Sequence, residues 1–215
     1  MDTISERLVQ AVVLLQRQYL LTEHLIQTRG PVLQDFETAV AEQRQGLDNV
    51  LDAYNYVFAL VDHLVRYEKI AFGLPRLNQK SAHHRALRAG MGTLKQIRNQ
   101  LQHLNNGIEN ANSGPLLGAI CWVSGIRQFM AFFHDIGRAR SSPGIIFDTR
   151  DRRHLQQFCY VCNDTYHDLG AAIDAMRAFD AFISEVVHVT IDGKPYDPKD
   201  HYGALCVEVR LPETI

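Results

Sequence analysis

Three side chains that could act together on a phosphate ester lie within six residues of one another. Arg98 offers a permanent charge and a planar set of donors, Asn99 adds hydrogen-bonding groups, and His103 can take or give a proton near neutral pH. On a helix turning about 100° per residue, Asn99 and His103 at i and i+4 lie almost one above the other, whereas Arg98 and His103 are about 140° apart. The spacing predicts one polar site on a single helix.

Further polar residues of this helix extend the predicted site. Gln102 and Asn106 continue the polar side next to Arg98, and with Lys95 they are candidate substrate-binding residues. From residue 62 to residue 103 there are eight Lys or Arg against two acids, a local excess of six positive charges. Such a patch could bind a phosphate. The alternative interpretation is a solvated helix face, because Lys and Arg are mostly exposed wherever they occur.

The stretch Arg98, Asn99, three variable residues and His103 resembles the R-N-x-x-x-H signature of the HEPN superfamily, the higher eukaryote and prokaryote nucleotide-binding domains. The motif lies on an expected helix that follows another long helix, which is the placement found in that family. The resemblance covers about residues 1 to 110 and the helix from 169 to 187. It implies a bundle of four or five helices that dimerises so that the two motifs face a shared cleft.

The resemblance also implies an activity. Active HEPN proteins are metal-independent ribonucleases, including toxins and defence effectors. By this resemblance His103 would move the proton of a 2′-hydroxyl, Arg98 would hold the scissile phosphate and Asn99 would orient the groove; no cofactor is implied. The expected partners are a second copy of the chain, RNA and an antitoxin-like protein. Other HEPN proteins are non-catalytic nucleotide-binding or dimerisation modules, and that alternative stays open.

Other titratable residues have simpler interpretations. Asp62 and Glu68, on the preceding helix, could assist the site, but ion pairs with Arg66 or Lys69 are the favoured interpretation. His83 and His84 are expected to be solvated at the start of a helix.

Four residues from 154 to 167 could supply two thiolates and two imidazoles to zinc: His154, Cys159, Cys162 and His167. If residues 158 to 162 form a strand, however, Cys159 and Cys162 point to opposite faces. Buried thiols are therefore favoured over zinc, and no metal site is predicted. Without an export signal, the four cysteines at 121, 159, 162 and 206 are expected to be reduced.

Apolar residues at spacings of three, four or seven predict most of the helices. The expected helices are 3 to 28, a shorter one ending near 44, 47 to the stop at Gly73, 80 to 109, and one from the N-cap Asp168 to about 187. Short apolar runs predict strands at 119–123, 128–134, 144–148 and 158–162, with further strands at 187–191 and 205–211.

The predicted fold is mainly α: a HEPN-like helical bundle with a small strand-rich insertion and a β tail, α+β overall. Residues 1–190 would form one helical domain with the insertion at about 119–163, and residues 191–215 the C-terminal β tail. The chain has 215 residues, 46% hydrophobic residues and a formal net charge of −2, so it can bury a core but has no global attraction for polyanions. The N-terminal residues lack a basic signal-peptide region, and we expect a cytoplasmic protein.

Overall fold

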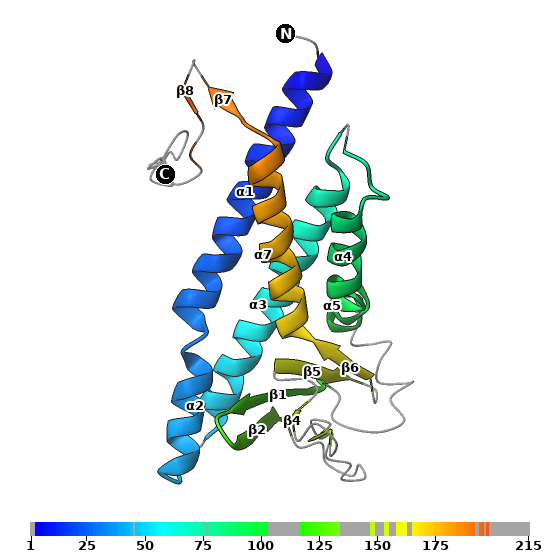
Figure 1. The fold of residues 1–215 in the computed structure, drawn as a ribbon. Coiled ribbons are helices and arrows are strands. Elements are labelled where there is room, and N and C mark those ends of the chain that lie inside the picture. Colours follow the sequence, from blue (N-terminus) through cyan, green and yellow to red (C-terminus); the bar gives the residue numbers. More distant parts are fainter. Residues whose placement is uncertain are drawn as a thin grey trace, which may run out of the picture.

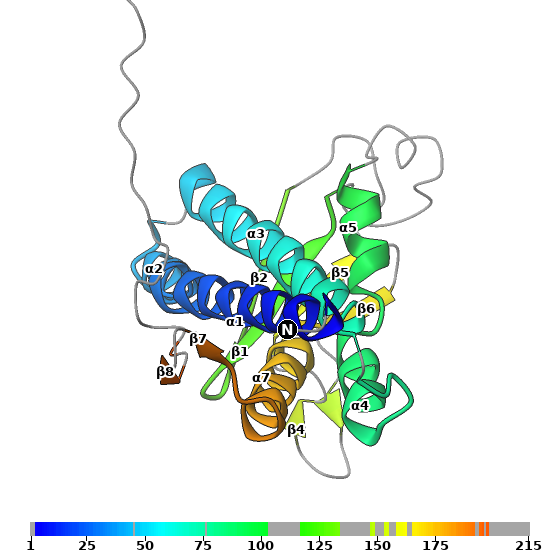
Figure 2. The same cartoon turned by 90° about the horizontal axis from the view of Figure 1, so that it is seen from above.

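The helix α3 (Leu47–Phe72) is the central element of a computed structural model of the protein. The structure describes residues 3–44, 46–75, 77–102, 117–133, 147–148, 153–154, 158–162, 165–191, 194–195 and 197. Around α3 lie α1 (Thr3–Arg29), α2 (Val32–Ala41), α4 (Ala82–Met91), α5 (Leu94–Gln102) and α7 (Leu169–Val186), and all five contact it. Figures 1 and 2 show α1 and α2 on one side of α3 and α4 and α5 on the other.

The apolar periodicity of α3 explains its central position. Its buried residues recur at helical spacing along most of its length: Ala53, Tyr54, Val57, Leu60, Val61, Leu64, Val65 and Ala71. Burying one such large apolar side chain stabilises a fold by about 1.5 to 3 kcal/mol. The helix ends at Gly73, whose backbone N–H bonds to the carbonyl oxygens of Lys69 and Ile70. The predicted helix from 47 to this stop is confirmed.

A four-stranded antiparallel sheet covers one end of the bundle (Figure 1). Its order is β2 (Arg127–Phe132), β1 (Ala119–Ser124), β5 (Phe158–Cys162) and β6 (Thr165–Asp168). Two short ribbons complete the described strands: β3 (Phe147–Asp148) with β4 (Arg153–His154), and β7 (Thr190–Ile191) with β8 (Lys194–Pro195). The prediction of a mainly α, α+β fold is confirmed, and the structure shows that the strands form a small antiparallel sheet.

Aromatic residues pack the inner face of the sheet against α2 and α3 through ring contacts and hydrogen bonds. The indole N–H of Trp122 donates a 2.8 Å hydrogen bond to Oε1 of Glu37, and the indole ring meets Phe36 edge-on at 5.3 Å between centroids. The Tyr54 hydroxyl donates to the carbonyl oxygen of Gly118 at 2.6 Å. Gly118 has φ of +69°, and a Cβ there would lie 2.5 Å from the carbonyl oxygen of Val161, so only glycine fits.

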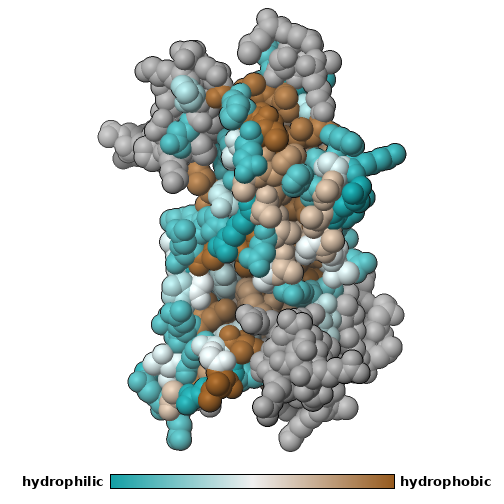
Figure 3. Space-filling model, in the orientation of Figure 1, coloured by the Kyte–Doolittle hydropathy of each residue, from teal (hydrophilic) through white to brown (hydrophobic). Residues whose placement is uncertain are grey.

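The helix α7 closes the bundle against α4, α3 and α1. Asp168 caps it by accepting a hydrogen bond from the Ala171 N–H at 2.9 Å, as predicted. Leu169, Ile173, Met176 and Phe179 are buried in the contact. The outer side of α7 carries small exposed residues, among them Ala178 and Ala181, and Figure 3 shows apolar colour over this helix.

Three predictions differ from the structure. The helix expected from 80 to 109 is wrong as a single element, because Gly92, with φ of +44°, ends α4 and a new helix starts at Leu94; residues 103–109 lie outside the described part of the chain. The sheet continues past residue 163 into β6, which was not predicted. His84 is 1% exposed rather than solvated, because its ring packs edge-on against Phe72 and Phe179.

The remaining expected elements agree in part. The helices expected at 3–28 and up to 44 correspond to α1 and α2, and the strands expected at 119–123, 128–134 and 158–162 correspond to β1, β2 and β5. Of the strand expected at 144–148 only 147–148 is described, and the strand expected at 205–211 lies outside the described residues. Within the described part of the chain, no helix is long and apolar enough to cross a membrane.

Candidate functional site

The helix α5 carries the first two residues of the predicted site. Leu94 and Ile97 are buried, and they pack the helix against α3. Arg98 flanks this apolar stripe and is partly buried, whereas Asn99 and Lys95 are exposed. The backbone of Gln102 belongs to α5, but its side chain, and the whole of His103 and Asn106, lie outside what the structure describes.

Arg98 is held by a carboxylate of the central helix. Its Nε donates a 2.7 Å hydrogen bond to Oδ1 of Asp62, while Nη2 of Arg66, one turn further along α3, lies 2.6 Å from Oδ2 of the same carboxylate. The Arg98 and Asp62 side chains are 23% and 27% exposed. The predicted Asp62 to Arg66 ion pair is confirmed, and Arg98 is a second partner that the sequence did not show.

The two guanidinium groups keep Asp62 ionised. Burial alone would raise the pKa of this carboxyl, but the hydrogen bond from Arg98 and the charges of Arg66 and Arg98 outweigh burial, and the pKa is lowered. Both carboxylate oxygens are engaged by cations. Asp62 is therefore suited to orienting Arg98 and unsuited to accepting a proton near neutral pH.

Glu68 is the second acid on this side of α3. Burial raises the pKa of its carboxyl, and the nearby charges of Lys95, Arg88 and Lys69 act in the opposite direction. Lys69 was an expected neighbour of Glu68, but Lys95 and Arg88 were not. Arg88 also lies over the ring of Phe72, with Cζ 4.6 Å from the ring centroid.

Together these residues form a basic cluster between α3, α4 and α5. We define it as five cations around the carboxylates of Asp62 and Glu68: Arg66, Lys69, Arg88, Lys95 and Arg98. The local excess of positive charge in the sequence indicated this cluster, although the chain as a whole is slightly acidic. The cluster can attract and hold a polyanion.

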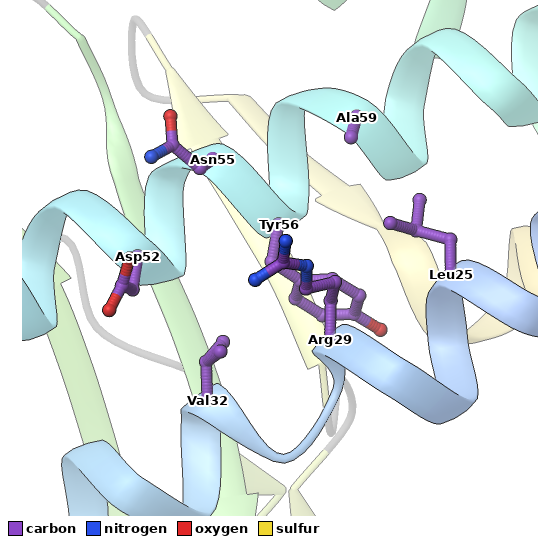
Figure 4. A pocket seen from close by; sticks show the side chains of 7 residues that line it. All are labelled: Leu25, Arg29, Val32, Asp52, Asn55, Tyr56 and Ala59. Carbon is purple, nitrogen blue, oxygen red and sulfur yellow. The ribbon is translucent and has the colours of Figure 1, made fainter.

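A pocket of about 260 Å³ lies elsewhere, where the elbow between α1 and α2 meets α3 (Figure 4). It is lined by Leu25, Arg29, Val32, Asp52, Asn55, Tyr56 and Ala59. Burial is the largest effect on the buried Tyr56 hydroxyl and raises its pKa to about 12, so it stays protonated near neutral pH. None of the predicted site residues lines this pocket.

Of the four residues considered for zinc, those whose side chains the structure describes do not lie together. Cys159 and His167 point to opposite faces of the sheet, because Cys159 pairs with Asp168 while His167 pairs with Tyr160. The His167 ring bonds through Nδ1 to the hydroxyl of Thr93, and burial lowers its pKa to about 4. In the described part of the chain, no three His, Cys, Asp or Glu side chains are arranged to hold a metal ion.

Comparisons of the chain with protein-family models, with curated proteins and with solved structures find no match. The resemblance to HEPN proteins accordingly depends on the short motif at Arg98, Asn99 and His103 and on the helical setting of its first two residues.

Proposed function

We propose that this protein is a metal-independent RNA endonuclease of HEPN type that acts as a homodimer, as a toxin or defence component. The observation that supports it best is the anchoring of Arg98 by Asp62 within the basic cluster. An Arg at a phosphate site must be both charged and fixed in direction. The hydrogen bond from Nε supplies the direction, and the surrounding cations favour a phosphodiester over a neutral substrate.

The geometry around Arg98 suits a phosphate oxygen. A guanidinium has five N–H donors in one plane, and the contact with Asp62 uses only the one on Nε. The other four lie on the Nη atoms, the part of the group that binds phosphate in pairs of parallel hydrogen bonds. In the proposed reaction Arg98 stabilises the charge that develops on the phosphorane.

The rest of the cluster would bind the substrate strand. Lys95, an exposed residue one turn before Asn99 on α5, lies on the side of Glu68. Such cations contribute sequence-independent affinity for a nucleic acid, and this affinity falls steeply with salt. Gln102 and Asn106 keep their predicted roles as substrate-binding residues.

His103 is the proposed proton-transfer residue. It would remove the proton of the 2′-hydroxyl, so that this oxygen attacks the adjacent phosphorus and the 5′-oxygen leaves with a proton. The products would be a 2′,3′-cyclic phosphate and a 5′-hydroxyl. Since each chain supplies one copy of the motif, a two-fold dimer would bring a second Arg98 and His103 to a shared cleft.

The first test compares the loss of Arg98 with the loss of another arginine that pairs with a carboxylate on a different helix. Arg98 donates from Nε to Asp62 at 2.7 Å. Arg177 donates from Nε to Glu23 on α1 at 2.7 Å, and its Nη2 also donates to the other oxygen of Glu23 at 3.0 Å. Purified wild type, Arg98→Ala and Arg177→Ala are incubated with single-stranded and structured RNA in EDTA. We expect cleavage by wild type and Arg177→Ala and a loss of about 10²-fold or more in Arg98→Ala.

Folding must be measured for the same three proteins. Partly exposed ion pairs contribute up to about 1 kcal/mol, so both variants should melt within a few degrees of wild type. Arg98→Lys should recover little cleavage, because an ammonium lacks the planar set of donors. Equal loss of cleavage in Arg98→Ala and Arg177→Ala would contradict a specific role for Arg98.

The alternative function is a non-catalytic HEPN-like module that binds a nucleotide or a protein. The overall acidity of the chain, with a net charge of −2, favours it. Absence of cleavage by wild type on several RNAs, together with salt-sensitive RNA or nucleotide binding that Arg98→Ala weakens, would favour this alternative over the nuclease.

A further inference from the structure

Two cysteines from different strands face each other directly in the middle of the sheet. Cys121 in β1 and Cys159 in β5 are partners in the antiparallel register, between the pairs Ile120 with Tyr160 and Trp122 with Phe158. Both thiols are free and both residues are 0% exposed. Thirty-seven residues separate them in the sequence, so this pairing is produced only by the fold.

The pair lies on the face of the sheet turned away from α2 and α3. Ile120, Trp122 and Tyr160, the alternating neighbours, belong to the main core, whereas Cys121 and Cys159 form a separate cluster with Ala119 and Val161. Across the four strands the register places Met130, Cys121, Cys159 and Asp168 in one row. The thiols therefore have sulfur and carboxylate neighbours in the same row.

The distances required for a disulfide are close to those expected at this position. Directly paired residues on antiparallel strands have Cα atoms about 4.5 or 5.5 Å apart and Cβ atoms about 4.5 to 5.5 Å apart. A disulfide requires Cα atoms about 4.4 to 6.8 Å apart and Cβ atoms about 3.5 to 4.5 Å apart. The strands need to approach by roughly 1 Å or less at the Cβ atoms.

The electrostatics differ between the two thiols. A hydrogen bond from Cys159 lowers the pKa of Cys121, although burial acts against it. The pKa of Cys159 is raised, first because its proton is held in that hydrogen bond and then by burial. We assign the first attack to Cys121 on this ground, and Cys159, its direct partner across the strands, is positioned to attack it in turn.

We propose that Cys121 and Cys159 are a reversible redox site that a small hydroperoxide converts to an intramolecular disulfide. The Cys121 sulfur attacks one oxygen of hydrogen peroxide, the O–O bond breaks, and a sulfenic acid and water form. The Cys159 sulfur then attacks the Cys121 sulfur, the S–O bond breaks, and the hydroxyl leaves as a second water with the Cys159 proton. Two thiols are oxidised, one peroxide is reduced, and a dithiol reductant reverses the change by thiol–disulfide exchange.

Burial determines how this site should react. Because both thiols are fully buried, the reaction depends on local opening of the sheet and favours a small, neutral oxidant over a bulky reagent. We expect peroxide to oxidise the pair more slowly than an exposed thiol, and iodoacetamide to modify neither cysteine in the folded protein on that time scale.

The test uses the full chain with Cys162→Ser and Cys206→Ser, which keeps only the proposed pair. The protein is treated with hydrogen peroxide, then unfolded and alkylated. Intact mass should show the loss of two hydrogen atoms and no alkylation, and dithiothreitol should restore two alkylatable thiols. In this background Cys121→Ser and Cys159→Ser each leave one cysteine and should yield no intramolecular disulfide.

Peptide mapping of the oxidised wild type under non-reducing conditions keeps the test informative if a serine variant fails to fold. A linked peptide pair containing Cys121 and Cys159 is expected. Two fully alkylatable thiols after prolonged peroxide treatment, or disulfides that join Cys121 or Cys159 only to Cys162 or Cys206, would overturn the proposal.

Discussion

Replacing Asp180 by Asn should stabilise this protein at neutral pH. Asp180 lies on α7, and its Oδ1 atom is buried without a hydrogen-bond partner among the described residues. Burial, and to a lesser extent the negative charge of Glu23 on α1, raises its pKa from 3.8 to about 6. Near pH 7 Asp180 is therefore ionised in an environment that disfavours its charge. An Asn side chain has nearly the same shape and carries no charge.

The magnitude follows from the two pKa values. Each pKa unit corresponds to about 1.4 kcal/mol, which gives an upper limit of about 3 kcal/mol. The residue is partly exposed, and solvent screening reduces the expected gain to about 1 to 2 kcal/mol. For a chain of this length that corresponds to a melting temperature roughly 2 to 8 °C higher.

The sign of the pH dependence is opposite to that of an ion-paired acid. Between pH 4 and pH 6 the folded state holds the Asp180 proton more tightly than the unfolded state, so this group's contribution to stability is present below pH 4 and is lost as pH rises to 6. The difference between Asp180→Asn and wild type should therefore be near zero at pH 4, grow up to about pH 6 and stay constant above it.

Thermal unfolding followed by circular dichroism at several pH values tests this prediction. Asp174→Asn, an exposed carboxylate on the same helix, is the matched control and should change stability by less than about 0.5 kcal/mol. A difference between Asp180→Asn and wild type that is the same at pH 4 and pH 7.5, or an unstable Asp180→Asn protein at pH 7.5, would refute the reasoning.

Three further predictions concern the site, the packing and the assembly. Asp62→Asn should lower RNA cleavage by releasing Arg98, with little change in melting temperature; unchanged cleavage would show that Asp62 does not position Arg98. Gly90→Ala should cost about 1 to 3 kcal/mol in urea unfolding, because its Cβ would lie 2.3 Å from Cβ of Ala175, and Ala175→Gly should restore part of the loss; a stabilised Gly90→Ala protein would contradict this contact. We expect the protein to be a dimer with residues 80 to 110 at or beside its interface. Light scattering at micromolar concentration measures the mass, and a monomer would remove the basis of a composite site.

The helices were predictable where one periodicity runs without interruption. In α3 the apolar residues recur along the whole element and Gly73 ends it, so sequence and structure agree. The break at Gly92 was missed because Leu87, Met91, Leu94 and Ile97 keep helical spacing across it. An isolated glycine is tolerated within many helices, and only the backbone angle distinguishes an interruption.

The strand β6 and the Arg98 contact could not be predicted for a different reason. β6 has four residues, two of them His167 and Asp168, and it is a strand because β5 pairs with it. Asp62 and Arg98 are 36 positions apart, and no local pattern joins them. The charge count indicated a basic surface, but which carboxylate holds Arg98 is decided by how α5 packs on α3.

The measurement that tests the proposed function most directly is RNA cleavage by wild type and His103→Ala in EDTA, with product ends identified. We predict that wild type cleaves RNA, leaves a 2′,3′-cyclic phosphate and does not cleave the same strand with 2′-deoxy sugars, and that His103→Ala is slower by about 10²-fold or more. His24→Ala, which changes an exposed histidine of α1, is the matched control and should cleave like wild type. Equal cleavage by wild type and His103→Ala would contradict the proposed function.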